Sequence, residues 1–200
     1  QITANASHTC ALLENRTVKC WGNNFFGQLG LGDLENRGDG PNEMGSALPT
    51  INLGSASSVQ SISAGGAFTC ALLQSGQLKC WGRNENGILS RKWCQDVDGN
   101  AGLCSNSNYP LNLRGLGLSS SHMGNALLPV DLGTGHTATK ITTGDSHVCA
   151  TLENNKIKCW GANQYGQLGI GSTVEKGILD TDMGNSLQEV DLGTSLTLSS

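Results

Sequence analysis

Residues 10–30 read CALLENRTVKCWGNNFFGQLG, and the same pattern returns twice further along the chain. Residues 70–90 read CALLQSGQLKCWGRNENGILS, and residues 149–169 read CATLENNKIKCWGANQYGQLG. A second block that begins with Met-Gly follows each copy, at Met44, Met123 and Met183. Similarity at a fixed period is typical of repeat architectures, so the chain is interpreted as three tandem repeats.

The spacing between the copies defines the repeating unit. Cys10 and Cys70 are 60 positions apart, whereas Cys70 and Cys149 are 79 apart, so the second copy is 19 residues longer. The insertion is placed within residues 89–123, because the blocks on either side keep their lengths. The predicted units are therefore residues 1–61, 62–140 and 141–200.

Composition favours short strands and argues against several functional classes. Glycine is 28 of 200 residues, about twice its usual share of roughly 7%. The net charge is −4 and the basic residues are scattered, which argues against nucleic-acid binding. No apolar run approaches the roughly 18 residues of a membrane helix, and the first residues lack the features of a signal peptide. We therefore expect neither a membrane span nor a precursor.

Each copy contains a predicted β-hairpin. Pairing Leu13 with Thr17 leaves a three-residue loop and places Cys10 opposite Cys20. The last loop position is expected to have a positive φ angle. This position holds Arg16, Gly76 and Asn155 in the three copies. Glycine and asparagine suit a positive φ angle, and arginine does not.

Both faces of the predicted hairpin are largely apolar. Leu12 and Val18 share the face of the cysteines, and Leu13 and Trp21 share the opposite face. A sheet that is wetted on one side would alternate apolar and polar residues, so each sheet is expected to be covered on both sides. The exception is the lysine before the second cysteine, which is expected to extend its ammonium group towards solvent: Lys19, Lys79 and Lys158.

Two further strands are predicted in each unit. One covers residues 48–53, 128–132 and 188–192, and the other covers residues 59–63 and 139–142. The predicted fold class is thus all-β, with three tandem four-stranded blades of a β-propeller. Closed propellers have four to eight blades, so either a longer polypeptide or several chains are expected to complete the structure.

The stretch HTCALLENRTVKCWGNNFFGQLGLG, which starts at His8, and its two counterparts resemble the regulator-of-chromosome-condensation repeats. Ala-Leu, Trp-Gly-x-Asn and Gly-Gln-Leu-Gly recur in order, and the second copy departs from this pattern at residues 88–90. The resemblance implies blades of a seven-bladed propeller. It does not imply one function, because this fold serves nucleotide exchange, light sensing, enzyme inhibition and scaffolding.

All eight cysteines fall into pairs that are ten positions apart: Cys10 and Cys20, Cys70 and Cys80, Cys94 and Cys104, Cys149 and Cys159. Three of these pairs lie cross-strand in the predicted hairpins, where the Cβ atoms come close enough for a disulfide. Four disulfides are therefore predicted, each stabilising the fold by roughly 2–3 kcal/mol. Disulfides persist in oxidising compartments, so an extracellular or cell-surface location is expected.

A metal site is the alternative interpretation of the cysteines. His8 precedes Cys10 by two positions, and His147 repeats this arrangement. Phe68 replaces the histidine in the second copy while both cysteines remain, and the short Cys-x-x-Cys spacing of zinc sites is absent. Disulfides are therefore favoured over a metal.

Two glycosylation sequons, at Asn5 and Asn15, agree with a secreted protein. Chance occurrence of these short motifs is the alternative. Asn15 falls in a predicted hairpin loop, where a glycan has room.

The chain offers little sign of catalysis or of a cofactor. No nucleophile, base and orienting group are recognised together, so no enzyme is expected. Packing explains the repeated tryptophans, Trp21, Trp81 and Trp160. A weak calcium candidate lies in the insertion at Asp96, Asp98 and Asn100. It lacks the glutamate of an EF-hand, and a solvated turn is the alternative.

These patterns predict an extracellular structural or scaffold protein that self-assembles into a filament or surface layer. Its expected partners are proteins, either copies of itself or further repeats of a longer chain. The loops at residues 31–45, 89–124 and 170–184 vary between copies, as in scaffolds that carry recognition. The alternatives are a secreted protein-binding module, such as an enzyme inhibitor, and an adhesin that binds carbohydrate or calcium through the insertion.

Overall fold

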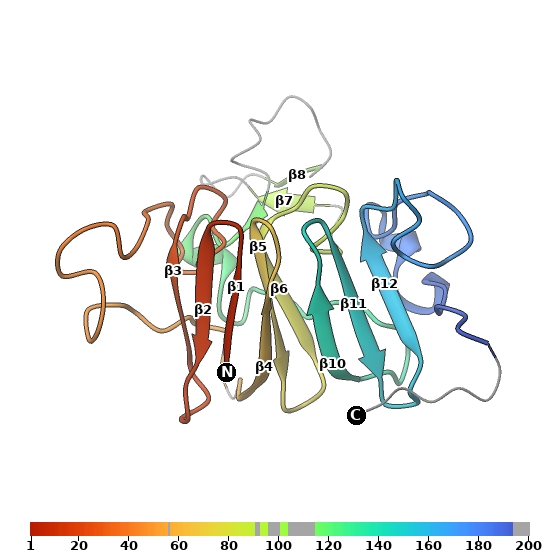
Figure 1. The fold of residues 1–200 in the computed structure, drawn as a ribbon, viewed down its shortest axis with the longest axis horizontal. Helices are drawn as coiled ribbons and strands as arrows, with labels where there is room; N and C mark the ends of the chain where they lie inside the picture. Colours follow the sequence, from red (N-terminus) through yellow and green to blue (C-terminus); the bar gives the residue numbers. More distant parts are fainter. Residues whose placement is uncertain (56, 91–92, 96–100, 104–114, 194–200) are drawn as a thin grey trace.

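The computed structural model describes residues 1–55, 57–90, 93–95, 101–103 and 115–193. Three antiparallel sheets stand side by side in chain order (Figure 1). We call them blades 1, 2 and 3. Helical structure within the described ranges is limited to the single 3-10 turns η2 (Ser120–His122), η3 (Asp180–Asp182) and η4 (Gly184–Ser186). The predicted all-β class is therefore confirmed.

The blades are built from short consecutive strands. Blade 1 contains β1 (Ile2–Asn5), β2 (His8–Leu12) and β3 (Val18–Gly22). Blade 2 contains β4 (Val59–Ala64), β5 (Phe68–Leu73), β6 (Leu78–Arg83) and β9 (Gly115–Leu116). Blade 3 contains β10 (Ala138–Thr143), β11 (His147–Leu152) and β12 (Ile157–Gly161). A separate two-stranded ribbon pairs β7 (Trp93–Gln95) with β8 (Ala101–Leu103) in the insertion.

The hairpin register agrees with the prediction. In blade 1, Cys10 lies opposite Cys20 and Leu12 lies opposite Val18. The three cysteine pairs in the hairpins have Cα atoms 4.1–4.2 Å apart and form disulfides: Cys10–Cys20, Cys70–Cys80 and Cys149–Cys159. The predicted pair of Cys94 and Cys104 lies outside the described residues.

The three hairpin loops close in the same way. The last loop residue has a positive φ angle in each copy, at 65° for Arg16, 78° for Gly76 and 62° for Asn155. Arg16 thus adopts the left-handed backbone that arginine disfavours. The Leu13 N–H donates to the Thr17 carbonyl at 2.9 Å, so the geometry of the three-residue loop prevails over the preference of the side chain.

The predicted fourth strand is wrong in its position. Residues 48–53, 128–132 and 188–192 form no strand, although Glu189 makes an isolated bridge with Lys158. Ile51, Val130 and Val190 each donate one N–H to the hairpin of their own blade. The position of a fourth strand, beside β3 in blade 1, is occupied by Arg37, which forms an isolated β-bridge with Gly22. Lys176 forms the equivalent bridge with Gly161 in blade 3. In blade 2, β9 extends this contact to two residues. The predicted boundaries after residues 61 and 140 fall inside β4 and β10.

Each hairpin has two distinct faces. The Cys face carries the disulfide, and the Trp face carries the tryptophan, with Leu13, Leu73 or Leu152 beside it. One apolar cluster joins the Cys face of blade 1 to the Trp face of blade 2, and a second joins the Cys face of blade 2 to the Trp face of blade 3. We call these contacts joint 1–2 and joint 2–3. The prediction that both faces of a sheet are covered thus holds for blade 2. Blades 1 and 3 each have one face covered by blade 2.

Candidate functional site: the joints between the blades

A buried tryptophan donates a hydrogen bond across each joint. Trp81 is fully buried, and its Nε1–H donates to the Gln28 carbonyl of blade 1 at 3.0 Å. Trp160 does the same to the Ile88 carbonyl of blade 2 at 2.8 Å. The tryptophans therefore do more than fill space, because each one also fixes the position of the preceding blade.

A buried lysine makes a second contact across each joint, contrary to the expectation that it extends to solvent. Lys79 Nζ donates to the Leu53 carbonyl of blade 1 at 2.6 Å, and Lys158 Nζ donates to the Leu132 carbonyl of blade 2 at 2.9 Å. Both lysines also bond the glycine of their own Met-Gly block. Neighbouring backbone carbonyls offer these ammonium groups the hydrogen bonds that burial would otherwise remove.

The Met-Gly blocks complete the polar part of the joints. In joint 1–2 the Gly124 N–H donates to the Asn52 carbonyl at 2.9 Å, and the Ser55 N–H donates to Asn125 Oδ1 at 3.0 Å. Joint 2–3 repeats both bonds, at 3.2 Å and 2.9 Å, through Gly184 and Asn185. The repeated Met-Gly-Asn sequence thus serves recognition between blades.

A buried asparagine shapes the loop that presents the carbonyl acceptor. Asn24 Oδ1 accepts the Leu29 N–H at 3.0 Å, next to the Gln28 carbonyl that binds Trp81. The equivalent asparagines, Asn84 and Asn163, bind Leu89 and Leu168 in the same way. These asparagines lie in the Trp-Gly-x-Asn element, so their regular recurrence is the sequence signal that could have revealed this role.

His8 adds a polar contact to joint 1–2. The Thr69 hydroxyl donates to the Gln28 carbonyl at 2.9 Å, so its oxygen accepts a hydrogen from His8 Nε2, which lies 2.9 Å away. His8 Nδ1 is buried without a hydrogen-bond partner. Burial lowers the pKa of His8 from 6.5 to about 4, so the ring is neutral at ordinary pH.

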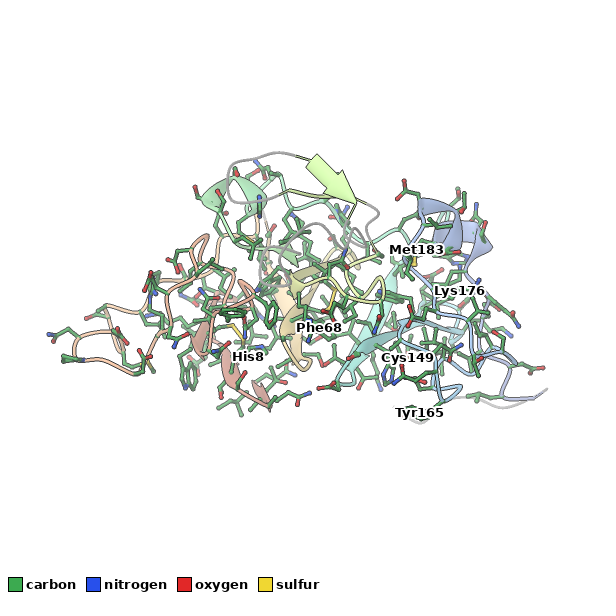
Figure 2. The ribbon with its side chains drawn as sticks, turned by 90° about the horizontal axis from the view of Figure 1, so that it is seen from above. His8, Phe68, Cys149, Tyr165, Lys176 and Met183 are labelled. Carbon is green, nitrogen blue, oxygen red and sulfur yellow. A yellow bond between two sulfur atoms is a disulfide. The ribbon has the colours of Figure 1, made fainter. Side chains whose placement is uncertain are left out.

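The counterparts of His8 differ in their surroundings. Figure 2 shows His8, Phe68 and Cys149 on successive sheets across the molecule. Phe68 takes the histidine position in blade 2 and is fully buried in the cluster of joint 2–3. His147 takes it on the open Cys face of blade 3, where partial burial lowers its pKa. The candidate metal ligands are therefore not grouped as a site. Both cysteines of each set form a disulfide, His8 bonds Thr69 across joint 1–2, and His147 lies on the open Cys face of blade 3.

One half of a joint is open at each end of this chain. The Trp face of blade 1 leaves Leu13 38% and Met44 43% exposed, whereas their counterparts Leu73 and Met123 are 4% and 6% exposed. On blade 3, Leu192 is 53% exposed, whereas Leu53 is 4% exposed. These are the apolar residues that the joints bury where a neighbouring blade is present.

The remaining predicted sites have separate locations. Asn15 is exposed on the hairpin tip, whereas Asn5 lies in β1 and its Nδ2–H₂ donates to the Ala64 carbonyl of blade 2 at 3.5 Å. The calcium candidates Asp96, Asp98 and Asn100 lie outside the described residues. In the ranges that are described, no three His, Cys, Asp or Glu side chains are grouped to hold a metal. The same ranges contain no helix that is long and apolar enough to cross a membrane.

A groove of about 610 Å³ lies in the long loop of blade 1. The exposed ring of Phe25 lines it together with Arg37 and the carboxylates of Glu35, Asp39 and Glu43. Glu43 Oε2 accepts the N–H groups of Gly38, Asp39 and Gly40. This carboxylate therefore holds the loop itself and offers little to a ligand.

Comparisons with known proteins agree with this architecture. Two family models for the regulator of chromosome condensation (RCC1) repeat match, one at residues 1–28, 59–88 and 138–167 and the other at residues 18–72. Among curated proteins, the mitochondrial RCC1 domain-containing protein RUG3 of Arabidopsis thaliana is 34% identical over 173 residues. That match covers 86% of this chain and 32% of RUG3. The ultraviolet-B receptor UVR8 of the same plant is 33% identical over 86% of this chain and 31% of its own length.

Solved structures show the same fold. Yeast RCC1 (Prp20), in its complex with Kap60, is 21% identical and superposes with a TM-score of 0.65. That match covers 98% of this chain and 37% of Prp20. Human WBSCR16 is 17% identical, with a TM-score of 0.59, over 96% of this chain and 39% of its own. The chain thus spans about a third of the length of these relatives, and it belongs to the RCC1 repeat family of β-propeller proteins.

Proposed function

We propose that this chain is a scaffold that binds proteins through its open blade faces and self-assembles into a structural array outside the cell. One observation carries the proposal. Both joints use the same set of contacts, namely a tryptophan N–H, a lysine ammonium and a glycine N–H, each donated to a carbonyl of the preceding blade. Blade 1 presents the donors of a further joint, and blade 3 presents the acceptors.

The donors and acceptors at the two ends correspond residue by residue. Trp21 occupies the position of Trp81. Lys19, whose Nζ donates to the Gly45 carbonyl at 2.8 Å, occupies that of Lys79. On blade 3, Gln167 and Leu192 hold the carbonyl positions of Gln28 and Leu53. A blade that fills either end therefore buries exposed apolar side chains, the main source of free energy in protein association.

The extracellular location is supported by the cysteines. Three disulfides link hairpin strands, and such bonds persist in oxidising compartments. Asn15 supports the same location, since its sequon lies on an exposed tip. Expression through a eukaryotic secretory pathway should give one glycan, at Asn15 and not at Asn5, because the Asn5 side chain lies against blade 2. A glycosidase-sensitive mass shift that Asn15→Gln abolishes and Asn5→Gln keeps would support this assignment, and retention of the shift in Asn15→Gln would contradict it.

The native mass of the unreduced protein tests the proposal. Multi-angle light scattering over a range of protein concentrations, with negative-stain imaging, should show rings or polymers whose mass grows with concentration. A compact monomer at every concentration would overturn self-assembly. If the natural polypeptide is longer, the full-length protein should be measured in the same way, and a monomer would then place the acceptors of blade 3 within its own propeller.

A second candidate function is a secreted module that binds one target protein through its loops. The groove beside Phe25 favours it, because exposed aromatic rings often anchor protein interfaces. Under this function the protein is monomeric, and Phe25→Ala weakens target binding while Tyr165→Ala, which removes another exposed ring, does not. Unchanged target binding by Phe25→Ala would exclude the groove.

A further inference from the structure

At the boundary between blades 1 and 2, an aromatic ring and a carboxylate together hold an arginine. The Arg83 guanidinium of blade 2 lies over the Phe26 ring of blade 1, with Cζ 4.9 Å from the ring centroid. The Glu85 carboxylate forms an ion pair with the same guanidinium. The face of an aromatic ring attracts a cation through its quadrupole, so the ring and the carboxylate act on this guanidinium in the same sense.

The neighbouring aromatic residue also lies beside carboxylates. Phe25 packs edge to face against Phe26, with the ring centroids 5.0 Å apart, and it is 53% exposed. The ring lines the groove of about 610 Å³ together with Glu35. The Asn24 N–H donates to Asn36 Oδ1 at 2.9 Å and so holds the segment of Phe25 against that of Glu35. The groove therefore combines a ring and a carboxylate, as the Arg83 contact does.

The charge of the groove favours a cationic occupant. Its lining contains the carboxylates of Glu35, Asp39 and Glu43 and one guanidinium, that of Arg37. Arg37 is already paired with Asp33 at 2.7 Å. Among the residues that the structure describes, the three carboxylates have no cationic side chain as a partner, and the side chain of Glu35 makes no hydrogen bond. Such complementarity selects a positively charged group and repels a negatively charged one.

Neighbouring blades leave the Phe25 end of the groove accessible. Blade 1 is followed by blade 2, and Phe25 is exposed although blade 2 is in place. Blade 3 is preceded by blade 2, and its counterparts of Phe25 and Glu35 are Gln164 and Val174. Both are exposed there, Val174 by 61%. The accessibility of this end therefore does not depend on where the chain begins or ends.

We propose that the Phe25 end of the groove binds an arginine side chain of a partner protein. The guanidinium stacks on the Phe25 ring and pairs with the Glu35 carboxylate, in the way that the chain holds its own Arg83. Arginine suits this site better than lysine, because its planar and weakly hydrated guanidinium stacks on aromatic faces. The inference rests on the second candidate function, the binding of a target protein through the loops, and it specifies the chemistry of that target.

Saturation-transfer NMR on the unreduced protein tests the inference, since it detects weak ligands of monomers and of large assemblies alike. The probe is the peptide acetyl-Gly-Arg-Gly-amide, and the matched control carries citrulline, which has nearly the shape of arginine without its charge. Saturation should reach the arginine methylene protons and decrease as salt is added, and the citrulline peptide should bind much more weakly. Equal binding of the two peptides, or no binding of the arginine peptide, would overturn the inference.

Variants assign the binding to the Phe25 end of the groove. Phe25→Ala and Glu35→Gln should each weaken binding of the arginine peptide by about 2- to 5-fold. The controls are Tyr165→Ala, which removes another exposed ring, and Glu14→Gln, which removes an exposed carboxylate on the hairpin tip. Neither control should change the binding, and equal weakening by the controls would overturn the site. Unfolding in urea verifies that each variant is folded.

The same variants separate this inference from the functions proposed above. A target protein that Phe25→Ala no longer binds and that Glu35→Gln binds unchanged would keep the groove as a binding site and overturn the arginine. Light scattering tests self-assembly independently of the groove, so a monomeric protein that binds the arginine peptide would overturn self-assembly and support this inference.

Discussion

Blade 2 and blade 1 have nearly the same hairpin sequence, yet they have different surroundings. Every residue of β5 is buried, whereas β2 has only His8 and Cys10 fully buried. The two hairpins share their register, their disulfide and their loop geometry. Local sequence therefore makes the hairpin, and the neighbouring blade determines how much each residue contributes to stability.

The tryptophans provide the sharpest test of this difference. Trp81→Ala should lower the free energy of unfolding by about 3–5 kcal/mol, because it removes a fully buried ring and leaves the Gln28 carbonyl without its donor. Trp21→Ala, on the half-buried open face, should lower it by much less. Urea unfolding of the unreduced protein at low concentration measures both. Equal losses in the two variants would show that the face of blade 1 is covered in solution.

Acidification should lower the stability of joint 1–2 more than that of joint 2–3. The pKa of His8 is about 4 in the folded protein, against an ordinary value of 6.5, so the unfolded chain binds more protons between these values. The contribution of neutral His8 to the free energy of unfolding is therefore fully present above about pH 6.5. It is lost as the pH falls towards 4, by about 3 kcal/mol in all.

His8→Phe, which copies blade 2, should remove most of this pH dependence. Joint 2–3 has no histidine at this position, so Phe68→Leu serves as a control that leaves the pH profile unchanged while lowering stability. Unfolding curves at pH 4.5 and pH 7.5 give the comparison. A His8→Phe profile as steep as that of the wild type would assign the pH dependence to other groups.

The lysines should show a smaller contrast of the same kind. Lys79→Met leaves the Leu53 and Gly124 carbonyls without this donor and should lower stability by about 1–3 kcal/mol. Lys19→Met, on the exposed end, should change the stability of the monomer by less than about 0.5 kcal/mol. Thermal or urea unfolding compares the two variants. If Lys79→Met leaves the free energy of unfolding unchanged, the packing of the methionine offsets both lost hydrogen bonds, contrary to this prediction.

Asn125 should give the smallest effect. Asn125→Ala removes the acceptor of the Ser55 N–H in an exposed setting, where water can replace it, so a loss of about 0.5 kcal/mol is expected. Asn125→Ser, which copies Ser46 of blade 1, should retain part of the bond. A loss above about 2 kcal/mol would show that the Met-Gly-Asn block orders the whole joint.

The sequence could predict features that depend on neighbours within one hairpin. The repeated spacing of the cysteines and Leu13–Thr17 pairing predicted the register, and the loop length predicted the left-handed residue at Gly76 and Asn155. The repeat also predicted which faces are apolar, because alternation along a strand is a local property.

Features that depend on backbone atoms of another blade could not be predicted in this way. Lys79 was expected to extend to solvent, since no sequence pattern shows that the Leu53 carbonyl lies within its reach. Residues 48–53 were expected to be a strand from their apolar pattern. In the structure Ile51 and Leu53 are buried in the cluster of joint 1–2, so the apolar pattern reflects packing between blades.

The tryptophans and lysines of each joint bond main-chain oxygens of the preceding blade, so these bonds do not depend on which side chain the accepting residue carries. Glutamine at position 28 and isoleucine at position 88 serve equally as acceptors for an indole, because their side chains take no part in that bond. A change of side chain at either position keeps this carbonyl acceptor, although both side chains are buried and make packing or hydrogen-bond contacts of their own. Loss of the tryptophan or the lysine, in contrast, removes the donor itself. A duplicated blade brings its own tryptophan and lysine donors, so these two bonds need no matching change of side chain in the neighbouring blade when an array lengthens by gene duplication.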